Sequence, residues 1–471
     1  MTPPALPLGE ERYTPTDGAE IVSGDHDPHL RGWTPVVMLA PVAPASLVAA
    51  ALLLNLHYPF LGRPVLEGLL TSRPVLGLGN AAFGLGVTQL MRKQGVPQPD
   101  RCERYSSSGV VDIYEPIEGS ASPDVPRTAV LYFHSGAFIG GHRSMGAGMC
   151  GWLASHGAVC LSASYRRTGS GAGVSGCIED AWTMFRWLRE PSNAARLNID
   201  PSQIVVAGDS AGGLLAAALA TGLDPASSSP VGGTELPAAL IGGWPVTALG
   251  SLTYAPRRAM DGRWEETPAG KEFRVANAFV PVDEHGHSAE ATQARLKTVF
   301  ASGFLCWGRR AFGLLPAAKK FPDDDAISVS PLRLADRVGL PPMLLLTGSA
   351  DQIVPCEQTS RFAEVAQDAG NEVAHLIFEG AVHGGGGVNS AAGRAAALAF
   401  LRHHGLIDSP VADDDTRDAI GGAMRAFSLE PVEYEPVQFQ PALDGRSTLH
   451  LKPLDSDSTD RERSGLGGGE L

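Results

Sequence analysis

The chain has 471 residues, of which 44% are hydrophobic, and a formal net charge of −14 at pH 7. These values indicate a globular protein with a sizeable core and argue against nucleic acid as a partner. The six cysteines contain no Cys-x-x-Cys pair, so we expect no zinc or redox centre of that type and no metal or cofactor.

Two segments precede the main body of the chain. Residues 1–35 are rich in Pro, Asp and Glu, have no apolar period, and are predicted to be disordered. Residues 36–95 are predicted to be hydrophobic and helical, and Val36–Leu56 contains 21 residues without a charge, long enough to span a bilayer. Pro41 and Pro44 would interrupt such a helix, so packing of this segment on the protein body is the alternative. We favour a single membrane anchor, and membrane association over a cytoplasmic location.

Strand-like and helix-like runs alternate through residues 96–407. The runs predicted as strands are Gly109–Tyr114, Ala129–Phe133, Ala158–Ala163, Ile204–Ala207, Ala238–Gly242, Met343–Thr347 and Val373–Phe378. Those predicted as helices are Ile178–Arg189, Leu214–Ala220, Glu357–Ala369 and Ala391–Arg402. Because the strands are almost continuously apolar, we expect an α/β fold whose mainly parallel sheet is covered by helices on both faces.

Two further segments break this rhythm. Residues 245–330 contain no clean strand and are too long for a simple loop, so they are predicted to be a helical insertion folded over one end of the sheet. Residues 408–471 contain 14 acidic and 6 basic residues, a net charge of −8 that exceeds half of the total. This composition predicts an acidic, largely disordered tail, with a short ordered piece near Ala423–Pro431.

A glycine-framed serine lies between a predicted strand and a predicted helix, in Gly208-Asp209-Ser210-Ala211-Gly212-Gly213. The Gly-x-Ser-x-Gly pattern alone is weak in a chain with 56 glycines, and a helix-capping turn serine is the alternative. A tight strand-to-helix turn needs glycine on both sides of the serine, because its backbones crowd together. Such a turn lifts the serine hydroxyl clear of the sheet, so we predict that Ser210 is a nucleophile, with Asp209 supporting the motif.

A serine nucleophile needs a base and an orienting carboxylate, which follow it in that fold in the order Ser, acid, His. His383 lies on a glycine-rich loop just after a predicted strand and is the predicted base. Other downstream histidines lie in less suitable places: His375 is inside a strand pattern, and His403 and His404 end a predicted helix. Asp351 follows a buried strand and is the predicted acid.

Glu379, which ends the strand before His383, is the fallback acid.

Backbone amides must hold the oxyanion of a tetrahedral intermediate. We predict that the amides of Gly136, Ala137 and Ala211 do so, supported by His134 and Ser135 in the loop after an early strand.

Together these segments resemble the hormone-sensitive-lipase-like branch of the α/β-hydrolases, also called the alpha/beta hydrolase fold-3 group. The matching pieces run in family order from about residue 109 to 405: "HSGAF", "SASYRR", "IEDAWTMFRWL", "NIDPSQIVVAGDSAGG", "ISVSPLR", "GSADQIVP" and "AVHGG". The resemblance implies an α/β-hydrolase fold and a serine hydrolase of carboxylic esters. It also implies that residues 245–330 and the N-terminal helices form a helical cap over the site. Some members of the family have one N-terminal membrane anchor.

The sequence departs from the family in two places. The family's glycine triplet is Ser135-Gly136-Ala137 here, and Ala137 has a Cβ that disfavours a positive φ. Either its backbone lies in an ordinary region or the oxyanion hole is distorted. In addition, the usual Leu-Ala-Pro is missing after Tyr165-Arg166.

Three functions remain open on the sequence. The first is an esterase, lipase or deacetylase that acts through an acyl-enzyme on an apolar small-molecule ester. The second is an amidase with the same machinery, such as an aryl formamidase. The third is a non-catalytic small-molecule receptor on the same scaffold. The sequence does not distinguish ester from amide and gives no oligomeric state.

Overall fold

The computed structural model describes residues 21–22, 95–117, 125–138, 140–167, 173–249, 328–351, 354, 356–384, 390–407 and 446–453. Most of the predicted disordered N-terminus, the hydrophobic segment up to residue 94, most of the predicted cap and most of the acidic tail lie outside the described residues. The proposed anchor at 36–56 is among them. Within the described part, no helix combines the length and apolar character needed to cross a bilayer.

The described strands form one sheet in the order β1-β2-β3-β5-β4-β6-β7-β8-β9-β10. Their bounds are β1 Ile21–Val22, β2 Arg101–Arg104, β3 Val110–Tyr114, β4 Arg127–Phe133, β5 Val159–Ala163, β6 Ile199–Asp209, β7 Ala239–Gly243, β8 Met343–Gly348, β9 Val373–Phe378 and β10 Arg446–Leu451. From β5 through β4 to β10 every neighbouring pair is parallel. The three strands at the other edge pair antiparallel. The predicted mainly parallel sheet is therefore confirmed.

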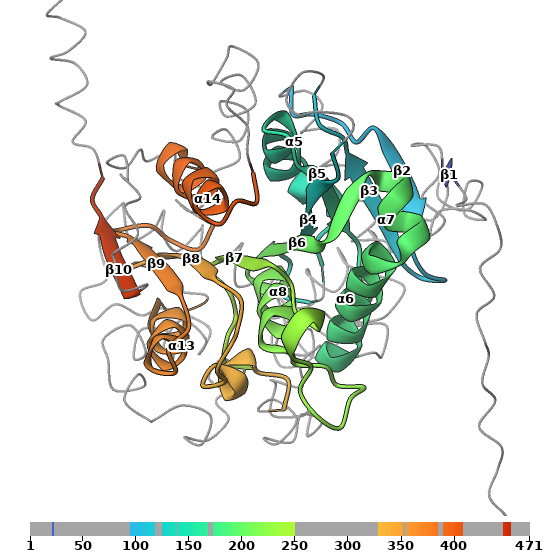
Figure 1. The fold of residues 1–471 in the computed structure, drawn as a ribbon. Helices are drawn as coiled ribbons and strands as arrows, with labels where there is room; N and C mark the ends of the chain where they lie inside the picture. The colour runs from blue at the N-terminus through green and yellow to red at the C-terminus, as the bar shows by residue number, and fades with distance from the viewer. Residues whose placement is uncertain are drawn as a thin grey trace, which may run out of the picture.

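Helices cover both faces of this sheet (Figure 1). The described helices are α5 Ala147–Ser155, α6 Gly173–Arg189, α7 Pro191–Leu197, α8 Ala211–Thr221, α13 Cys356–Asp368 and α14 Ala391–His403. Helices α5 and α14 lie on one face, and α6, α8 and α13 lie on the other. Successive side chains of strand β4 point to opposite faces of the sheet. Leu131 belongs to the core under α6 and α8, whereas Val130 belongs to the core under α5 and α14.

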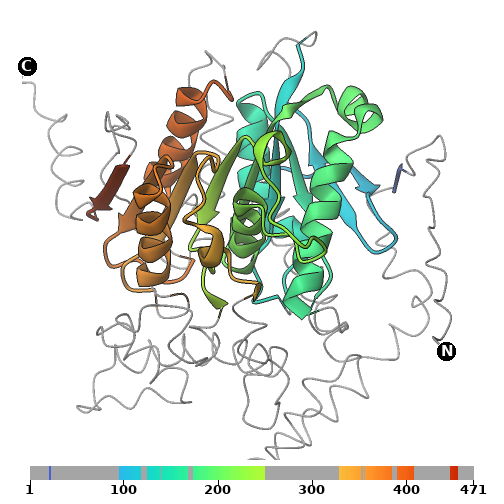
Figure 2. The ribbon, with the colours of Figure 1, turned by 60° about the horizontal axis from the view of Figure 1, so that its bottom comes forward.

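The parallel strands bring the ends of several segments to one edge of the sheet. Strands β6, β8 and β9 run in the same direction side by side with β7 between β6 and β8, as the two views in Figures 1 and 2 show. Their carboxyl ends are Asp209, Gly348 and Phe378. Because ligand-binding loops in parallel sheets follow the carboxyl ends of strands, residues just beyond these three positions can meet.

All seven strands predicted from the sequence are present, with ends shifted by a few residues. Strands β1, β2 and β10 were not predicted. β1 lies inside residues 1–35, and its antiparallel pairing with β2 shows that the prediction of disorder was wrong at Ile21–Val22. β10 lies inside the predicted acidic tail and extends the sheet by pairing parallel to β9, from Arg446 opposite Val373 to Leu451 opposite Phe378. Its short, largely polar sequence has no pattern that predicts a strand. The segment is a strand because its backbone hydrogen-bonds to β9. The ordered piece expected near 423–431 lies outside the described residues.

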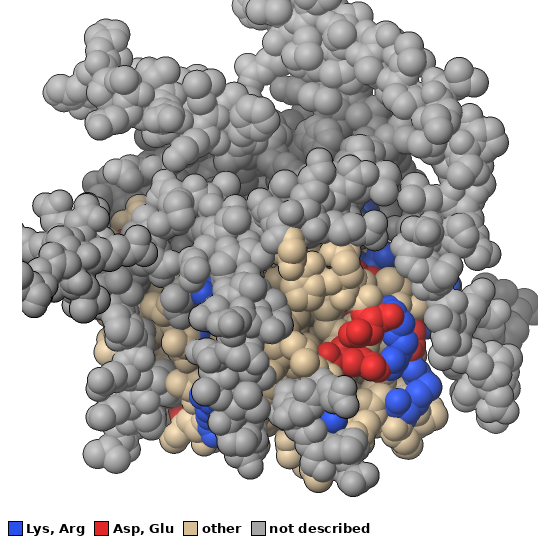
Figure 3. Space-filling model, turned by 90° about the horizontal axis from the view of Figure 1, so that it is seen from above, with Lys and Arg blue, Asp and Glu red and all other residues tan. Residues whose placement is uncertain are grey.

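Opposite charges lie together on the face seen from above in Figure 3, where described acidic and basic side chains touch. Opposite charges at such short separation largely cancel, so the described part of this face presents no field of a single sign.

The turn from β6 into α8 leaves no room for side chains at its glycines. A Cβ on Gly208 would lie 2.4 Å from the carbonyl oxygen of Gly212, and a Cβ on Gly212 would lie 2.0 Å from that of Phe133 at the end of β4. Both contacts are with backbone, which cannot rotate away. The predicted need for glycine on both sides of Ser210 is therefore confirmed.

Replacing Gly212 by Ala is expected to lower the free energy of unfolding by about 3 kcal/mol, because the added methyl group forces α8 away from β4. Urea unfolding followed by circular dichroism measures this loss. Gly232→Ala is the matched control, since its Cβ would meet only the end of the Arg337 side chain, at 2.9 Å. Equal stability of the two variants would contradict the proposed crowding.

Candidate active site

Ser210 occupies a strained turn position between β6 and α8. Its φ and ψ are +54° and −116°, which non-glycine residues rarely adopt. The turn is held because the Ser210 amide donates to the carbonyl of Gly243 at 2.9 Å and its carbonyl accepts from the Leu214 amide at 3.1 Å. Crowding and hydrogen bonds thus maintain a conformation that the local sequence alone disfavours.

The structure brings the three predicted triad residues together. His383 Nε2 lies 3.1 Å from Ser210 Oγ, and His383 Nδ1 lies 2.7 Å from Asp351 Oδ2. The three residues follow β6, β8 and β9, respectively. Because the carboxylate accepts from Nδ1–H, Nε2 is left with a lone pair toward the serine hydroxyl. This arrangement lets the imidazole take the hydroxyl proton.

Asp351 is fixed on both oxygens. While Oδ2 accepts from His383, Oδ1 accepts from the amide of Val354 at 2.9 Å, and the residue is buried. The fallback acid takes another partner: Glu379 Oε1 lies 3.6 Å from Nδ1 of His450 on β10. Glu379 as the partner of His383 was therefore wrong, because its side chain pairs with the neighbouring strand.

Asp209, directly before the nucleophile, is buried and accepts a hydrogen bond from β4. Tyr132 on β4 donates its hydroxyl to Asp209 Oδ2 at 2.8 Å. Burial raises the pKa of Asp209 to about 6, against the lowering effects of the Tyr132 hydrogen bond and of His383. The ionised carboxylate therefore disfavours the folded state, and this cost grows as the pH rises from about 4 to about 6.

The predicted oxyanion loop follows β4 and has an unusual backbone. Ala137 has a φ of +50° and Phe138 a φ of +61°, so the idea that Ala137 adopts an ordinary region was wrong. The left-handed conformation costs roughly 1–2 kcal/mol per non-glycine residue. Gly136 has a φ of +139°, and its carbonyl accepts from the Gly140 amide at 2.9 Å. Ala211, whose amide is the third predicted donor, is the first residue of α8.

His134 and Ser135 anchor the start of this loop. The His134 ring is fully buried, donates from Nδ1 to the Ser135 carbonyl at 2.7 Å, and stacks on Tyr165 with ring centroids 4.4 Å apart. Burial lowers the pKa of His134 to about 3, so the ring is neutral. Tyr165 also donates its hydroxyl to the His134 carbonyl at 2.8 Å, and Arg167 donates to that of Gly141 at 2.7 Å.

The sequence missed two residues that contact the triad or its neighbour. Trp244 lies edge-on to His383, with ring centroids 5.8 Å apart, and has a φ of +34°. Tyr132 holds Asp209, as described above. Trp244 directly follows β7, at the same sheet edge as the triad, and that position was its only signal in the sequence. Tyr132 looks like any core residue of a strand.

The chain matches a known protein family over more than half of its length. Residues 130–385, more than half of the chain, match the sequence profile of a family described as alpha/beta hydrolase fold. The matched range contains Ser210, Asp351 and His383.

Individual relatives are similar over shorter ranges. The carboxylesterase NlhH of Mycobacterium tuberculosis is 34% identical over 167 residues, which are 33% of this chain and 50% of that protein. The match thus spans about half the length of that relative. The arylacetamide deacetylase of Bos taurus is 26% identical over 58% of this chain and 71% of that protein. The solved, propionate-bound structure of Est2 from Thermogutta terrifontis is 28% identical over 67% of this chain and 98% of its own, with a TM-score of 0.46.

Replacing Tyr132 by Phe is expected to cost more stability at pH 8 than at pH 5. Above its pKa of about 6 the Asp209 carboxylate is ionised and loses a charge-assisted hydrogen bond, worth about 1.5–3 kcal/mol. Below this pKa the Asp209 carboxyl is protonated, and losing the Tyr132 hydrogen bond costs less stability. Urea unfolding at both pH values measures the difference.

Tyr114→Phe is the matched control, because the buried Tyr114 hydroxyl has no hydrogen-bond partner among the described residues. A Tyr132→Phe cost that is the same at both pH values would argue against an ionised Asp209 at neutral pH.

Proposed function

Because the chain belongs to the hormone-sensitive-lipase-like family of the alpha/beta hydrolase fold, we propose that it is a serine hydrolase that cleaves carboxylic esters through an acyl-enzyme. The single observation that supports this most is the continuous contact from Asp351 through His383 to Ser210, at 2.7 and 3.1 Å. The relatives described above, a carboxylesterase and a deacetylase by name, support the same class.

In the proposed first half of the reaction, Ser210 Oγ attacks the ester carbonyl while His383 Nε2 accepts the hydroxyl proton. Asp351 holds the imidazole in the reactive tautomer and stabilises the imidazolium that forms. The amides of Gly136, Ala137 and Ala211 bind the oxyanion, and each such donor is typically worth about 3 kcal/mol in the transition state. His383 then gives the proton to the leaving alkoxide.

In the second half, His383 takes a proton from water, which attacks the acyl-enzyme and releases the acid and Ser210. We assign an apolar ester as substrate. The indole of Trp244, beside the catalytic imidazole, supports this assignment by placing an apolar surface near the reacting groups.

A second candidate activity is the cleavage of aryl acetamides. The similarity to the arylacetamide deacetylase of Bos taurus favours it, and His383 would protonate an amine leaving group as it does an alkoxide. The receptor alternative has less support, because a receptor does not require an assembled Ser210–His383–Asp351 contact.

Ser210→Ala and Asp351→Asn are each expected to lower kcat/KM for p-nitrophenyl esters by about 10⁴-fold or more. Glu379→Gln is the matched control and is expected to keep near-normal activity, since Glu379 pairs with His450. A panel of p-nitrophenyl esters of increasing acyl length, with an aryl acetamide alongside, measures both candidate activities. Activity that survives in Ser210→Ala would exclude the mechanism, and tight ligand binding without any turnover would favour the receptor.

We also propose that the protein is associated with a membrane through residues 36–56, on the strength of their 21-residue uncharged run. The full chain is then expected to pellet with membranes after a salt wash, whereas a chain that starts at Arg92 stays in the supernatant. If both forms remain in the supernatant, the segment packs on the protein instead.

A further inference from the structure

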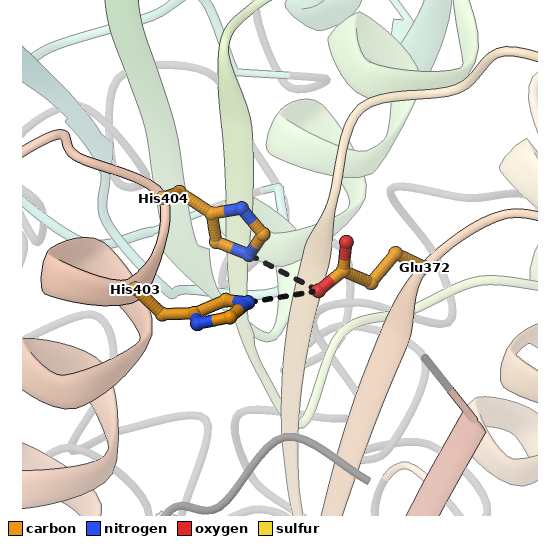
Figure 4. Close-up of side chains that lie close together, drawn as sticks. All are labelled: Glu372, His403 and His404. Carbon is orange, nitrogen blue, oxygen red and sulfur yellow. Dashed lines mark ion pairs between the residues drawn. The ribbon is translucent and has the colours of Figure 1, made fainter. Parts of the chain in front are cut away.

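Two adjacent histidines and a glutamate converge at the end of the sheet opposite to the candidate active site. His403 is the last residue of α14, His404 follows it, and Glu372 directly precedes the first residue of β9. Nε2 of His404 lies 3.4 Å from Glu372 Oε1, and Nε2 of His403 lies 3.9 Å from the same oxygen. Both imidazoles point toward that one carboxylate oxygen (Figure 4).

The spacing of these donor atoms matches a small divalent cation. Zinc binds imidazole nitrogen and carboxylate oxygen at about 2.0–2.2 Å, so two ligands of a tetrahedral zinc lie about 3.4 Å apart. The three donor atoms all lie within 4.8 Å of one another. The side chains of His403 and Glu372 are 41% and 43% exposed. Small rotations of these two side chains can therefore bring His403 Nε2 to about 3.4 Å from Glu372 Oε1 and from His404 Nε2.

The third ligand is already held in place. His404 has only 15% of its side chain exposed, and its ring packs against the buried Phe400 with ring centroids 4.7 Å apart. Its Nε2 atom is buried and has no hydrogen-bond partner among the described residues. Glu372 is fixed at its backbone, because its carbonyl accepts from the Met343 amide of β8 at 3.0 Å.

We propose that Glu372, His403 and His404 form a binding site for a divalent transition metal of the zinc class, with water completing the coordination. Two imidazoles and one carboxylate suit zinc better than the oxygen-preferring magnesium or calcium. The carboxyl end of α14 adds the negative end of a helix dipole, which favours a cation.

Such a metal would join the two elements that flank the loop of His383. Strand β9 leads into that loop and α14 leads out of it, and the site links the start of β9 to the end of α14. Binding of a metal to the folded state alone raises the free energy of unfolding. A metal bound here would therefore connect β9 to α14 at a point remote from the candidate active site.

The test is a zinc titration of the full, metal-stripped chain by calorimetry, followed by thermal unfolding. One zinc per chain is expected, with a midpoint raised by about 5 °C at a hundredfold excess over Kd, and no comparable shift with magnesium. Cobalt is expected to give the visible absorption of a tetrahedral site. Glu372→Gln and His403→Ala are expected to weaken zinc binding at least about tenfold.

The controls separate this site from other histidine–carboxylate pairs. His450→Ala removes the imidazole that pairs with Glu379 and is expected to leave zinc affinity unchanged. His383→Ala tests binding at the triad. The proposal is overturned if no saturable zinc binding occurs, or if binding is lost in His383→Ala and kept in Glu372→Gln and His403→Ala. Circular dichroism of the two exposed-residue variants checks that they are folded.

Discussion

The contact between the turn after β6 and the end of β4 determines the rest of the site. Gly208 and Gly212 allow the backbones of β6, α8 and β4 to approach to distances that any Cβ would prevent. That approach is stabilised by the packing of an entirely buried helix, α8, against the sheet. Ser210 is the residue left in the strained position, with a φ of +54°. This backbone conformation costs free energy locally, but the surrounding packing maintains it. The hydroxyl of Ser210 therefore points toward His383.

The electrostatics beneath the serine follow from the same burial. Asp209 loses its hydration on folding, and the Tyr132 hydroxyl and the field of His383 offset part of that cost. In contrast, Asp351 accepts hydrogen bonds from His383 and from Val354. The two carboxyl groups near the His383 imidazole thus have different roles. Asp351 orients the imidazole, whereas Asp209 is buried beneath the turn and is bound by Tyr132.

The sequence predicted the three triad residues but missed several of the contacts around them. Ser210, His383 and Asp351 were recognised because each follows a predicted strand. Glu379 met the same criterion, yet it pairs with His450 on a strand whose own sequence carries no strand signal. Trp244 has only its position just after a predicted strand as a signal, and Tyr132 has no local pattern that distinguishes it from other apolar residues of a strand. The cluster of Glu372 with His403 and His404 joins positions about thirty residues apart, which no motif spacing links.

The sequence by itself determined the fold class, the parallel strands and the order of nucleophile, acid and base, because periodicity and glycine placement act over a few residues. Only the tertiary structure decided which carboxylate reaches His383, that Ala137 takes a left-handed backbone with a φ of +50°, and that Asp209 is held by Tyr132. These outcomes depend on strand register and on packing between distant segments. Free energies of a few kcal/mol from such contacts outweigh the local preferences that a sequence pattern records.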